Sequence, residues 1–118
     1  SLQGSRALLL GVAYKRDVDD PRDSPAFPIM ELLVDSGAEL AYNDPHISVL
    51  PSMRHYDVPN LQSESLTPEL LGAQDCVVIV TDHSHYDWQL IADHSQLVVD
   101  TRNAMANVAQ PKARIVRA

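Results

Sequence analysis

The apolar residues of this chain gather in short continuous runs, which polar segments separate. A run of about four to eight apolar residues between polar boundaries is typical of a strand buried on both faces of a parallel sheet. We therefore expect strands at residues 6–13, 39–42, 76–80 and 97–99, and a short edge strand at 114–116. The run at 76–80 is the plainest, because every residue in it is apolar.

Helix signals lie between the expected strands. After the first strand comes a charged loop, and the pair Ser24-Pro25 then suits the N-cap and the first position of a helix. Ile29, Leu32 and Leu33 follow at the spacing of one helical face, so we expect them to point to the core. Pro28 leaves the start open, because a proline inside a helix removes a backbone hydrogen bond and would move the start one turn later.

Two further helices and one irregular segment complete the pattern. Thr67-Pro68-Glu69 has the cap, proline and acid order of a helix start, and it predicts a short helix that ends at Gly72. Another helix is expected at about 86–94. Residues 46–65 contain prolines and serines without periodicity, so we expect an irregular excursion with one short strand near Val58.

This alternation of elements predicts the fold class. Strands that are continuous apolar runs and that alternate with helices indicate an α/β fold: a doubly wound, mainly parallel sheet with helices on both faces, Rossmann-like in its layers. The 118 residues are enough for one compact domain, so we expect residues 1–118 to form a single domain. Because the chain starts almost directly at its first strand, we also expect it to be one domain of a longer protein.

Charge and composition narrow the partners. The chain has 9 basic and 16 acidic residues, and a net charge of −7 argues against a nucleic-acid partner and against an anionic membrane. No apolar run approaches the ~20 residues of a membrane span. The single cysteine, Cys76, excludes an internal disulfide and fits a reducing, cytoplasmic compartment.

Polar side chains follow four of the expected strands. They are Tyr14-Lys15, Asn43-Asp44, Thr81-Asp82-His83 and Asp100-Thr101-Arg102. Parallel strands point their carboxyl ends at one edge of the sheet, where open α/β sheets bind ligands. Lys15 and Arg102 are cations suited to a phosphorylated ligand. The structural alternative is that Arg102 only neutralises Asp100 and that Lys15 only pairs with a loop aspartate.

A dinucleotide site at the first loop is not supported. The chain has no G-x-G-x-x-G sequence and only four glycines, and no glycine follows Gly11 in the first loop. Without glycines the backbone cannot approach a pyrophosphate closely at the helix start. Asp44 stands where a ribose-binding acid would stand, but before Pro45 we interpret it as a turn residue.

Three other candidate chemistries are weak. Cys76 lies among valines, so we expect an inert thiol. His83 and His85 lack a third firm ligand, so we expect no metal. The four aspartates of segment 15–23 could hold magnesium, but such a run is more often a solvated loop. We expect them to pair with the basic residues Lys15, Arg16 and Arg22 of the same segment.

Three segments resemble a known family. Residues 11–26, GVAYKRDVDDPRDSPA, resemble the pattern G-x-[AS]-[FY]-K-x-[DN]-x-x-D-x-R-x-S at the start of the C-terminal domain of the UDP-glucose/GDP-mannose dehydrogenases. VVDTRNAM at 98–105 resembles the final strand of that domain, and TDHSHYDW at 81–88 is most similar to the version in UDP-N-acetylhexosamine dehydrogenases. The resemblance covers essentially the whole chain.

The resemblance implies a function. Members oxidise the sugar C6 alcohol to a carboxylate with NAD, and they combine an NAD-binding domain, a central helical dimerisation region and this substrate-binding domain. Tyr14, Lys15 and Arg102 match positions that contact the UDP-sugar, and Arg22 matches an arginine that reaches NAD across the domain cleft. The catalytic residues lie in the parts missing here, so the chain alone is expected to be inactive and the full-length protein to be a homodimer or larger. Pro21 departs from the family pattern, which usually has leucine or threonine there.

Two alternatives of other classes stay open. A receiver-like or other non-catalytic regulatory module is also a small doubly wound domain. It would need a phosphoacceptor aspartate after the third strand, which Asp82 could provide, and a lysine after the fifth, whereas Lys112 is in the tail. A domain that only mediates interactions would bind no ligand in the crevice at all.

Overall fold

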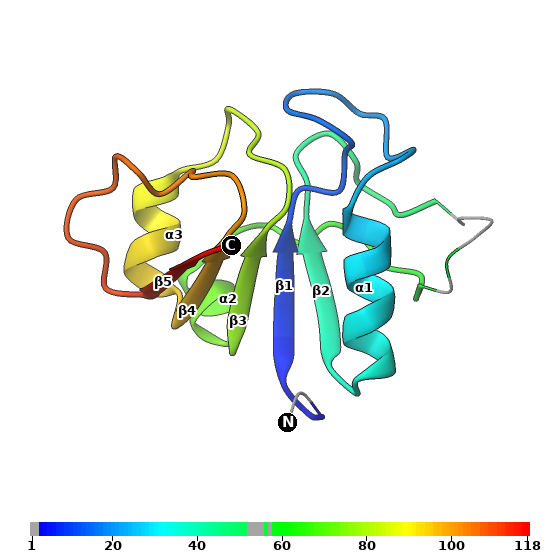
Figure 1. Ribbon diagram of the computed structural model, residues 1–118, viewed down its shortest axis with the longest axis horizontal. Coiled ribbons are helices and arrows are strands. Elements are labelled where there is room, and N and C mark those ends of the chain that lie inside the picture. The colour runs from blue at the N-terminus through cyan, green and yellow to red at the C-terminus, as the bar shows by residue number, and fades with distance from the viewer. Residues whose placement is uncertain (1–2, 52–55, 57) are drawn as a thin grey trace.

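The sheet and its helices follow in the alternating order that the apolar runs predict. The computed structural model of the protein describes residues 3–51, 56 and 58–118 (Figure 1). In chain order the elements are β1 (Arg6–Leu10), α1 (Ala26–Asp35), β2 (Glu39–Asn43), α2 (Pro68–Gly72), β3 (Cys76–Ile79), α3 (Trp88–His94), β4 (Leu97–Asp100) and β5 (Arg114–Arg117).

The five strands form one sheet in the order β2-β1-β3-β4-β5, and every pairing is parallel. From β1 the chain moves outward to β2 and then returns to the other side of β1 to form β3. The direction of winding therefore changes between β1 and β3, and the crevice at such a switch point is where doubly wound sheets bind ligands. The predicted fold class is confirmed.

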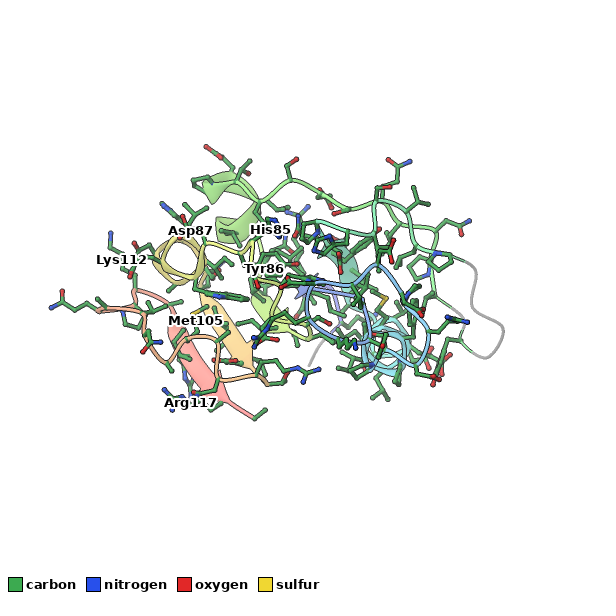
Figure 2. All side chains as sticks on the ribbon, turned by 90° about the horizontal axis from the view of Figure 1, so that it is seen from above. His85, Tyr86, Asp87, Met105, Lys112 and Arg117 are labelled. Atoms are coloured by element: carbon green, nitrogen blue, oxygen red, sulfur yellow. The ribbon has the colours of Figure 1, made fainter. Side chains whose placement is uncertain are left out.

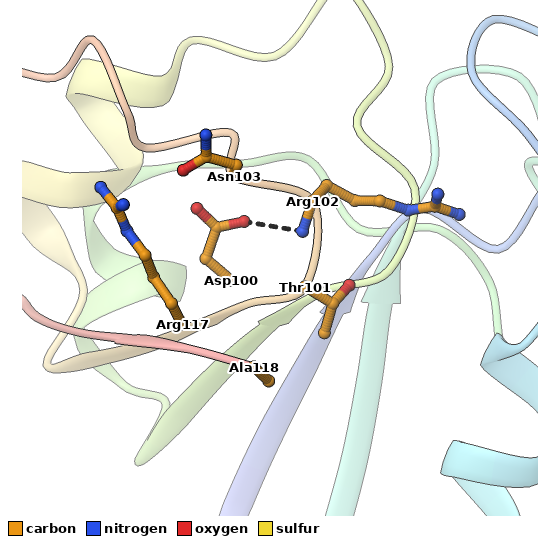
Figure 3. A pocket seen from close by; sticks show the side chains of 6 residues that line it. All are labelled: Asp100, Thr101, Arg102, Asn103, Arg117 and Ala118. Atoms are coloured by element: carbon orange, nitrogen blue, oxygen red, sulfur yellow. Dashed lines mark hydrogen bonds between the residues drawn. The ribbon is translucent and has the colours of Figure 1, made fainter.

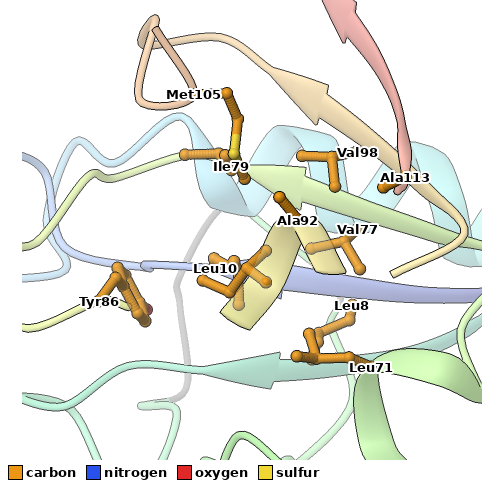
Figure 4. Packing of buried hydrophobic residues seen from close by; sticks show 11 residues of the cluster. Leu8, Leu10, Leu71, Val77, Ile79, Tyr86, Ala92, Val98, Met105 and Ala113 are labelled. Carbon is orange, nitrogen blue, oxygen red and sulfur yellow. The ribbon is translucent and has the colours of Figure 1, made fainter. Parts of the chain in front are cut away.

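Helices cover both faces of the sheet, because side chains alternate along each strand. On one face Leu9 of β1 packs with Phe27 and Met30 of α1. On the other face Leu8 and Leu10 pack with residues of α2 and α3, as Figure 4 shows for that cluster. Each face thus buries its own apolar core, which stabilises the strands from both sides.

Two details of the first half of the chain differ from the prediction. The first strand ends at Leu10 rather than residue 13, since Gly11 has a φ of +85° and leaves the ladder. Val12 and Ala13 are nevertheless fully buried. Their apolar character therefore reflects tertiary burial beyond the strand, which an apolar run does not distinguish from strand pairing.

The start and the buried face of α1 also differ. The helix begins at Ala26, one residue later than expected, and the Ser24 hydroxyl accepts a hydrogen bond from the Ala26 N–H at 3.1 Å. Pro28 falls in the first turn, where backbone N–H groups lack intrahelical partners, so it delays nothing. The expected inward face was wrong at Leu32, which is 68% exposed, because Phe27 and Met30 fill the core instead.

The second half agrees more closely. The helix at α2 and the strands β2, β3, β4 and β5 match their predicted bounds to within one residue, while α3 begins two residues late because Asp87 is its N-cap. No strand forms at Val58; an isolated bridge joins Val49 and Gln62 instead, and residues 52–55 and 57 of the expected excursion lie outside the described residues. In the part of the chain that the structure describes, no helix has the length and apolar character needed to span a bilayer.

Candidate functional site

The loops that leave the carboxyl ends of the strands are joined to one another by hydrogen bonds. The Thr81 hydroxyl, after β3, donates to the Ala13 carbonyl oxygen, after β1, at 2.6 Å. The Val12 N–H, after β1, donates to the Asp44 carboxylate, after β2, at 2.8 Å. Figure 2 shows the side chains from this carboxyl side of the sheet. Segments far apart in the sequence thus form one continuous polar edge, as predicted.

The centre of this edge is a buried pair, Asp44 and His83. The two side chains are completely buried, and His83 Nε2 lies 2.8 Å from an Asp44 carboxylate oxygen. The Asp44 carboxylate also accepts the N–H groups of Val12 and His46 at 2.8 Å each. Burial alone would raise the pKa of Asp44, but the hydrogen bonds from His83 and the two backbone N–H groups hold it below its ordinary value. Asp44 is therefore a charged acceptor inside the protein as well as a turn residue.

Asp17 connects the first loop to the loop after β3. Its N–H donates to His83 Nδ1 at 2.8 Å, and its carboxylate accepts from the N–H and the hydroxyl of Ser84. These bonds from Ser84 lower the pKa of Asp17. We call Asp17, Asp44 and His83 together the loop anchor. Nearby, Arg16 pairs with Asp82 at 2.6 Å rather than with an aspartate of its own segment.

A turn fixed by hydrogen bonds to Asp100 places Arg102 at this edge. The buried Asp100 carboxylate accepts the N–H groups of Arg102, Ala104 and Met105 at 3.0, 3.0 and 2.9 Å, which fixes the turn after β4. The Arg102 guanidinium donates through Nε to the Val80 carbonyl oxygen at 2.9 Å. Figure 3 shows the side chain extending away from Asp100. The alternative in which Arg102 only neutralises Asp100 is therefore wrong, because the carboxylate binds the backbone.

Arg102 also lines a cavity of about 590 Å³, together with residues 100–101, Asn103, Arg117 and Ala118. Two arginines, Arg102 and Arg117, are thus among the residues of one open cavity in a chain with a net charge of −7, although Figure 3 shows the Arg102 guanidinium directed away from Arg117. Guanidinium groups are well matched to phosphate oxygens in charge and in geometry. The exposed Arg102 at this edge therefore suits a phosphorylated ligand.

Tyr14 and Arg22 line a second cavity, of about 310 Å³, with Asp20 and Asp23. Arg22 binds the Asp20 carboxylate through Nε and Nη2, at 3.0 and 2.8 Å, and this pair lowers the pKa of Asp20 to about 2. The Arg22 side chain is 82% exposed, so water screens the pair and a phosphate could compete for the guanidinium.

Lys15 is exposed, and its ammonium lies 5.3 Å from the centre of the Tyr14 ring. Within the described residues no ion pair joins it to an aspartate of the loop. β3 separates the strand that leads to Lys15 from the strand that leads to Arg102. The two cations therefore lie on one edge, and neither of the two cavities described above includes Lys15. A ligand would have to bridge the distance between Lys15 and Arg102.

The remaining candidate residues have structural roles. Cys76 opens β3, and burial raises the pKa of its thiol, which makes a nucleophilic thiolate less accessible. A possible metal cluster involves Asp17, His46 and His83, with ligand atoms within 4.8 Å of one another. It does not include His85. Both His83 nitrogens already have hydrogen-bond partners, so an ion would have to displace one of them.

The sequence did not reveal the structural roles of Asp44, His83 and Asp100 at this edge. Asp44 was interpreted as a turn residue, which its bond to the His46 N–H supports, but its bond to His83 joins residues 39 positions apart. No local pattern reports such a contact. An acid at the carboxyl end of an apolar strand, as at Asp44 and Asp100, was the available signal in the sequence.

Comparison with known proteins gives consistent results. The model of the UDP-glucose/GDP-mannose dehydrogenase family, UDP binding domain, matches residues 8–107. The chain is 27% identical over 113 residues to a UDP-N-acetyl-D-mannosamine dehydrogenase of Methanococcus maripaludis, covering 89% of this chain and 24% of the relative. It is 30% identical over 116 residues to a UDP-glucose 6-dehydrogenase of Rickettsia typhi, covering 94% and 26%.

A solved structure is similar over nearly the whole chain. The UDP-N-acetyl-mannosamine dehydrogenase Cap5O of Staphylococcus aureus superposes with a TM-score of 0.70 at 27% identity, over 98% of this chain and 26% of that protein. The chain thus spans about a quarter of the length of the relatives it matches. The receiver-like alternative shares the strand order, but β5 ends at Arg117 with no lysine at its carboxyl end.

Proposed function

Because the chain belongs to the UDP-glucose/GDP-mannose dehydrogenase family and corresponds to its UDP-binding domain, we propose that it is the C-terminal, substrate-binding domain of an NAD-dependent UDP-sugar 6-dehydrogenase. The full-length enzyme would oxidise the sugar C6 alcohol to a carboxylate in two hydride transfers. The observation that supports the proposal is Arg102: the Asp100 carboxylate binds its backbone N–H, the Val80 carbonyl oxygen holds its guanidinium, and the residue lies at the carboxyl edge of the sheet (Figure 3).

In this proposal Tyr14, Lys15 and Arg102 bind the UDP-sugar. Arg102 donates to the diphosphate through the Nη groups that its bond to Val80 leaves available. Lys15 supplies a second positive charge from the first loop, and Tyr14 offers an aromatic ring at 40% exposure. Charge-assisted hydrogen bonds of this kind are each worth roughly 1.5–3 kcal/mol.

Arg22 serves NAD across a cleft between domains. The cavity that it lines with Tyr14 adjoins the same loop as Lys15, so one segment would contact the substrate on one side and the cofactor on the other. The exposed pair with Asp20 holds the guanidinium in place until a phosphate replaces the carboxylate. NAD itself supplies the hydride acceptor, and most of its binding residues would lie in another domain.

The proposed sugar is a UDP-N-acetylhexosamine. The Methanococcus relative and the Staphylococcus structure are both named as UDP-N-acetylmannosamine dehydrogenases, and residues 81–88 resemble the version in that subgroup. The catalytic residues, the NAD-binding domain and the central helical region would belong to the rest of a cytoplasmic enzyme, which we propose to be a homodimer or larger. The chain by itself would then be inactive.

The test is NADH formation by the full-length protein. Supplied with NAD and a UDP-N-acetylhexosamine, it should produce two NADH per sugar, and UDP-glucose should be the poorer substrate. A preference for UDP-glucose would overturn the proposed sugar, and no NADH from any UDP-sugar would overturn the proposed reaction.

A further inference from the structure

Three loops of the carboxyl edge meet at the loop anchor, in which the side chains of His83 and Asp44 are buried. Asp17 follows β1, Asp44 follows β2 and His83 follows β3, and these strands are neighbours in the sheet at the point where the winding changes direction. We propose that His83 is a positioning residue, which through Asp17 holds the loop of Tyr14, Lys15 and Arg22 in its ligand-binding conformation. This inference rests on the proposed function for the identity of the ligands.

The hydrogen bonds fix the protonation of His83. The Asp17 backbone N–H can only donate, so His83 Nδ1 must accept and carries no proton. The proton of the neutral ring is therefore on Nε2, where it is donated to the Asp44 carboxylate at 2.8 Å. Asp44 selects the tautomer that leaves Nδ1 free to hold Asp17, as carboxylates do for histidines in many sites.

The two hydrogen bonds of His83 also argue against a metal site formed by Asp17, His46 and His83. An ion bound by Asp17, His46 and His83 needs a lone pair on a His83 nitrogen. One nitrogen accepts from Asp17 and the other donates to Asp44. Both nitrogens of His83 are therefore occupied without an ion, although His46 Nε2 is buried with no hydrogen-bond partner among the described residues. The geometry at His83 is that of a support.

What the anchor supports is the middle of the first loop. The Tyr14 N–H donates to the Asp20 carbonyl oxygen at 2.9 Å and closes a loop of residues 14–20. Asp17 lies at the centre of that loop and has a φ of 61°, a left-handed conformation that is unfavourable for a residue with a side chain. The conformation persists because the N–H of Asp17 is held by His83 and its carboxylate by Ser84.

The anchor is buried at His83 and Asp44, whereas Asp17 and the residues that the anchor positions are exposed. His83 and Asp44 have fully buried side chains, but Tyr14, Lys15 and Arg22 are open to solvent. In the segment from Tyr14 to Asp23, the hydrogen bonds described with other loops come from Arg16 and Asp17, and Val18 adds an apolar contact with one core cluster. Losing the His83 contact should therefore loosen the loop while the sheet and its two cores remain.

The experiment compares three variants of His83 in the full-length protein. His83→Asn keeps an acceptor near the position of Nδ1, His83→Gln keeps a donor near the position of Nε2, and His83→Ala removes both. The exposed histidine at the end of α3 gives the matched control, His94→Asn. The readouts are amide hydrogen exchange of the segment 14–20 and the dissociation constant for UDP.

We expect His83→Ala and His83→Gln to speed amide exchange of segment 14–20 by about tenfold or more. Both variants should also weaken UDP binding by about tenfold, because each loses about one hydrogen bond that holds the loop. His83→Asn should restore most of both, since it returns the acceptor for Asp17. A variant that only unfolds the domain would instead speed exchange throughout β1 and β3, and if all three did so, the positioning role would be overturned.

Two other outcomes separate this inference from the proposed function. If the wild type binds UDP and His83→Gln changes neither exchange nor affinity, the inference is overturned and the proposed function stands. If the wild type does not bind UDP, the proposed function fails, while faster exchange in His83→Gln with rescue in His83→Asn still supports the anchor.

Discussion

Gly11 marks the point where the chain leaves β1 for the ligand-binding edge, and its replacement by alanine should be costly. A Cβ added at Gly11 would lie 2.4 Å from the Thr81 carbonyl oxygen and 2.5 Å from Thr81 Cβ. Thr81 cannot move away easily, because its N–H and that of Val80 both donate to the Leu10 carbonyl oxygen. The clash therefore falls on the backbone just beyond the carboxyl ends of the adjacent strands β1 and β3.

The expected cost has two parts. A side chain at a φ of +85° costs about 1–2 kcal/mol for the left-handed conformation. Overpacking against a fixed neighbour costs typically 1–3 kcal/mol more. We therefore expect Gly11→Ala to lower the free energy of unfolding by about 2–5 kcal/mol, a large part of the roughly 5–15 kcal/mol that stabilises an ordinary domain.

Gly4 provides the matched control. It has a φ of +79°, but a Cβ there would meet no atom within 4 Å, so Gly4→Ala carries the conformational cost without the clash. Urea unfolding of the wild type and the two variants gives the loss in free energy of unfolding for each substitution. The difference between the two losses measures the cost of the clash with Thr81. If Gly11→Ala costs no more than Gly4→Ala, the reasoning about the contact between β1 and Thr81 is refuted.

Three further predictions concern Asp44, Arg22 and the chain as a whole. The pKa of Asp44 in the folded chain lies below the ordinary value of about 3.9, so the unfolded chain binds more protons than the folded chain at acidic pH. The charged Asp44 therefore stabilises the fold fully above about pH 3.9, and this stabilisation is lost as the pH falls through the pKa of the folded chain. Asp44→Asn should thus lower the free energy of unfolding by about 1–3 kcal/mol near pH 7, because its amide must face an N–H donor, and the difference from wild type should shrink below about pH 4. A difference that stays constant from about pH 7 to about pH 3 would contradict this. Arg22→Ala should raise the apparent KM for NAD more than that for the UDP-sugar, whereas Asp20→Asn, which keeps the guanidinium, should not; equal effects of the two variants would leave only the ion pair between them. The purified chain should form no NADH from NAD and a UDP-sugar, and measurable NADH would show that it holds the catalytic residues itself.

The sheet could be predicted from the sequence because its signals are local. The three central strands have continuous apolar runs, and Thr67-Pro68 shows a helix start at α2 whatever the surroundings. The errors occur at residues whose burial depends on tertiary packing rather than on the local sequence. Val12 and Ala13 extend the first apolar run because they are buried outside the sheet, and Leu32 is exposed because the apolar residues of α1 outnumber the places that its core offers.

The candidate site was predictable only as a list of strand ends. Parallel strands made it possible to expect that Lys15 and Arg102 share an edge, but the strand order was needed to see that β3 lies between them. His83 could not be assigned, because its partners Asp44 and Asp17 are 39 and 66 residues away. Residue type alone suggested a weak metal ligand, whereas the contacts indicate a support.

The most direct test of the central claim is a titration of UDP into the full-length protein. Lys15→Ala and Arg102→Ala should each weaken binding by about ten- to a hundredfold, and Arg102→Lys should recover only part of the loss because lysine keeps the charge without the two-pronged geometry. Arg6→Ala removes an exposed cation at the amino end of β1 and should change nothing. Equal affinities in the wild type, Lys15→Ala and Arg102→Ala, or no binding of UDP by the wild type, would contradict the account.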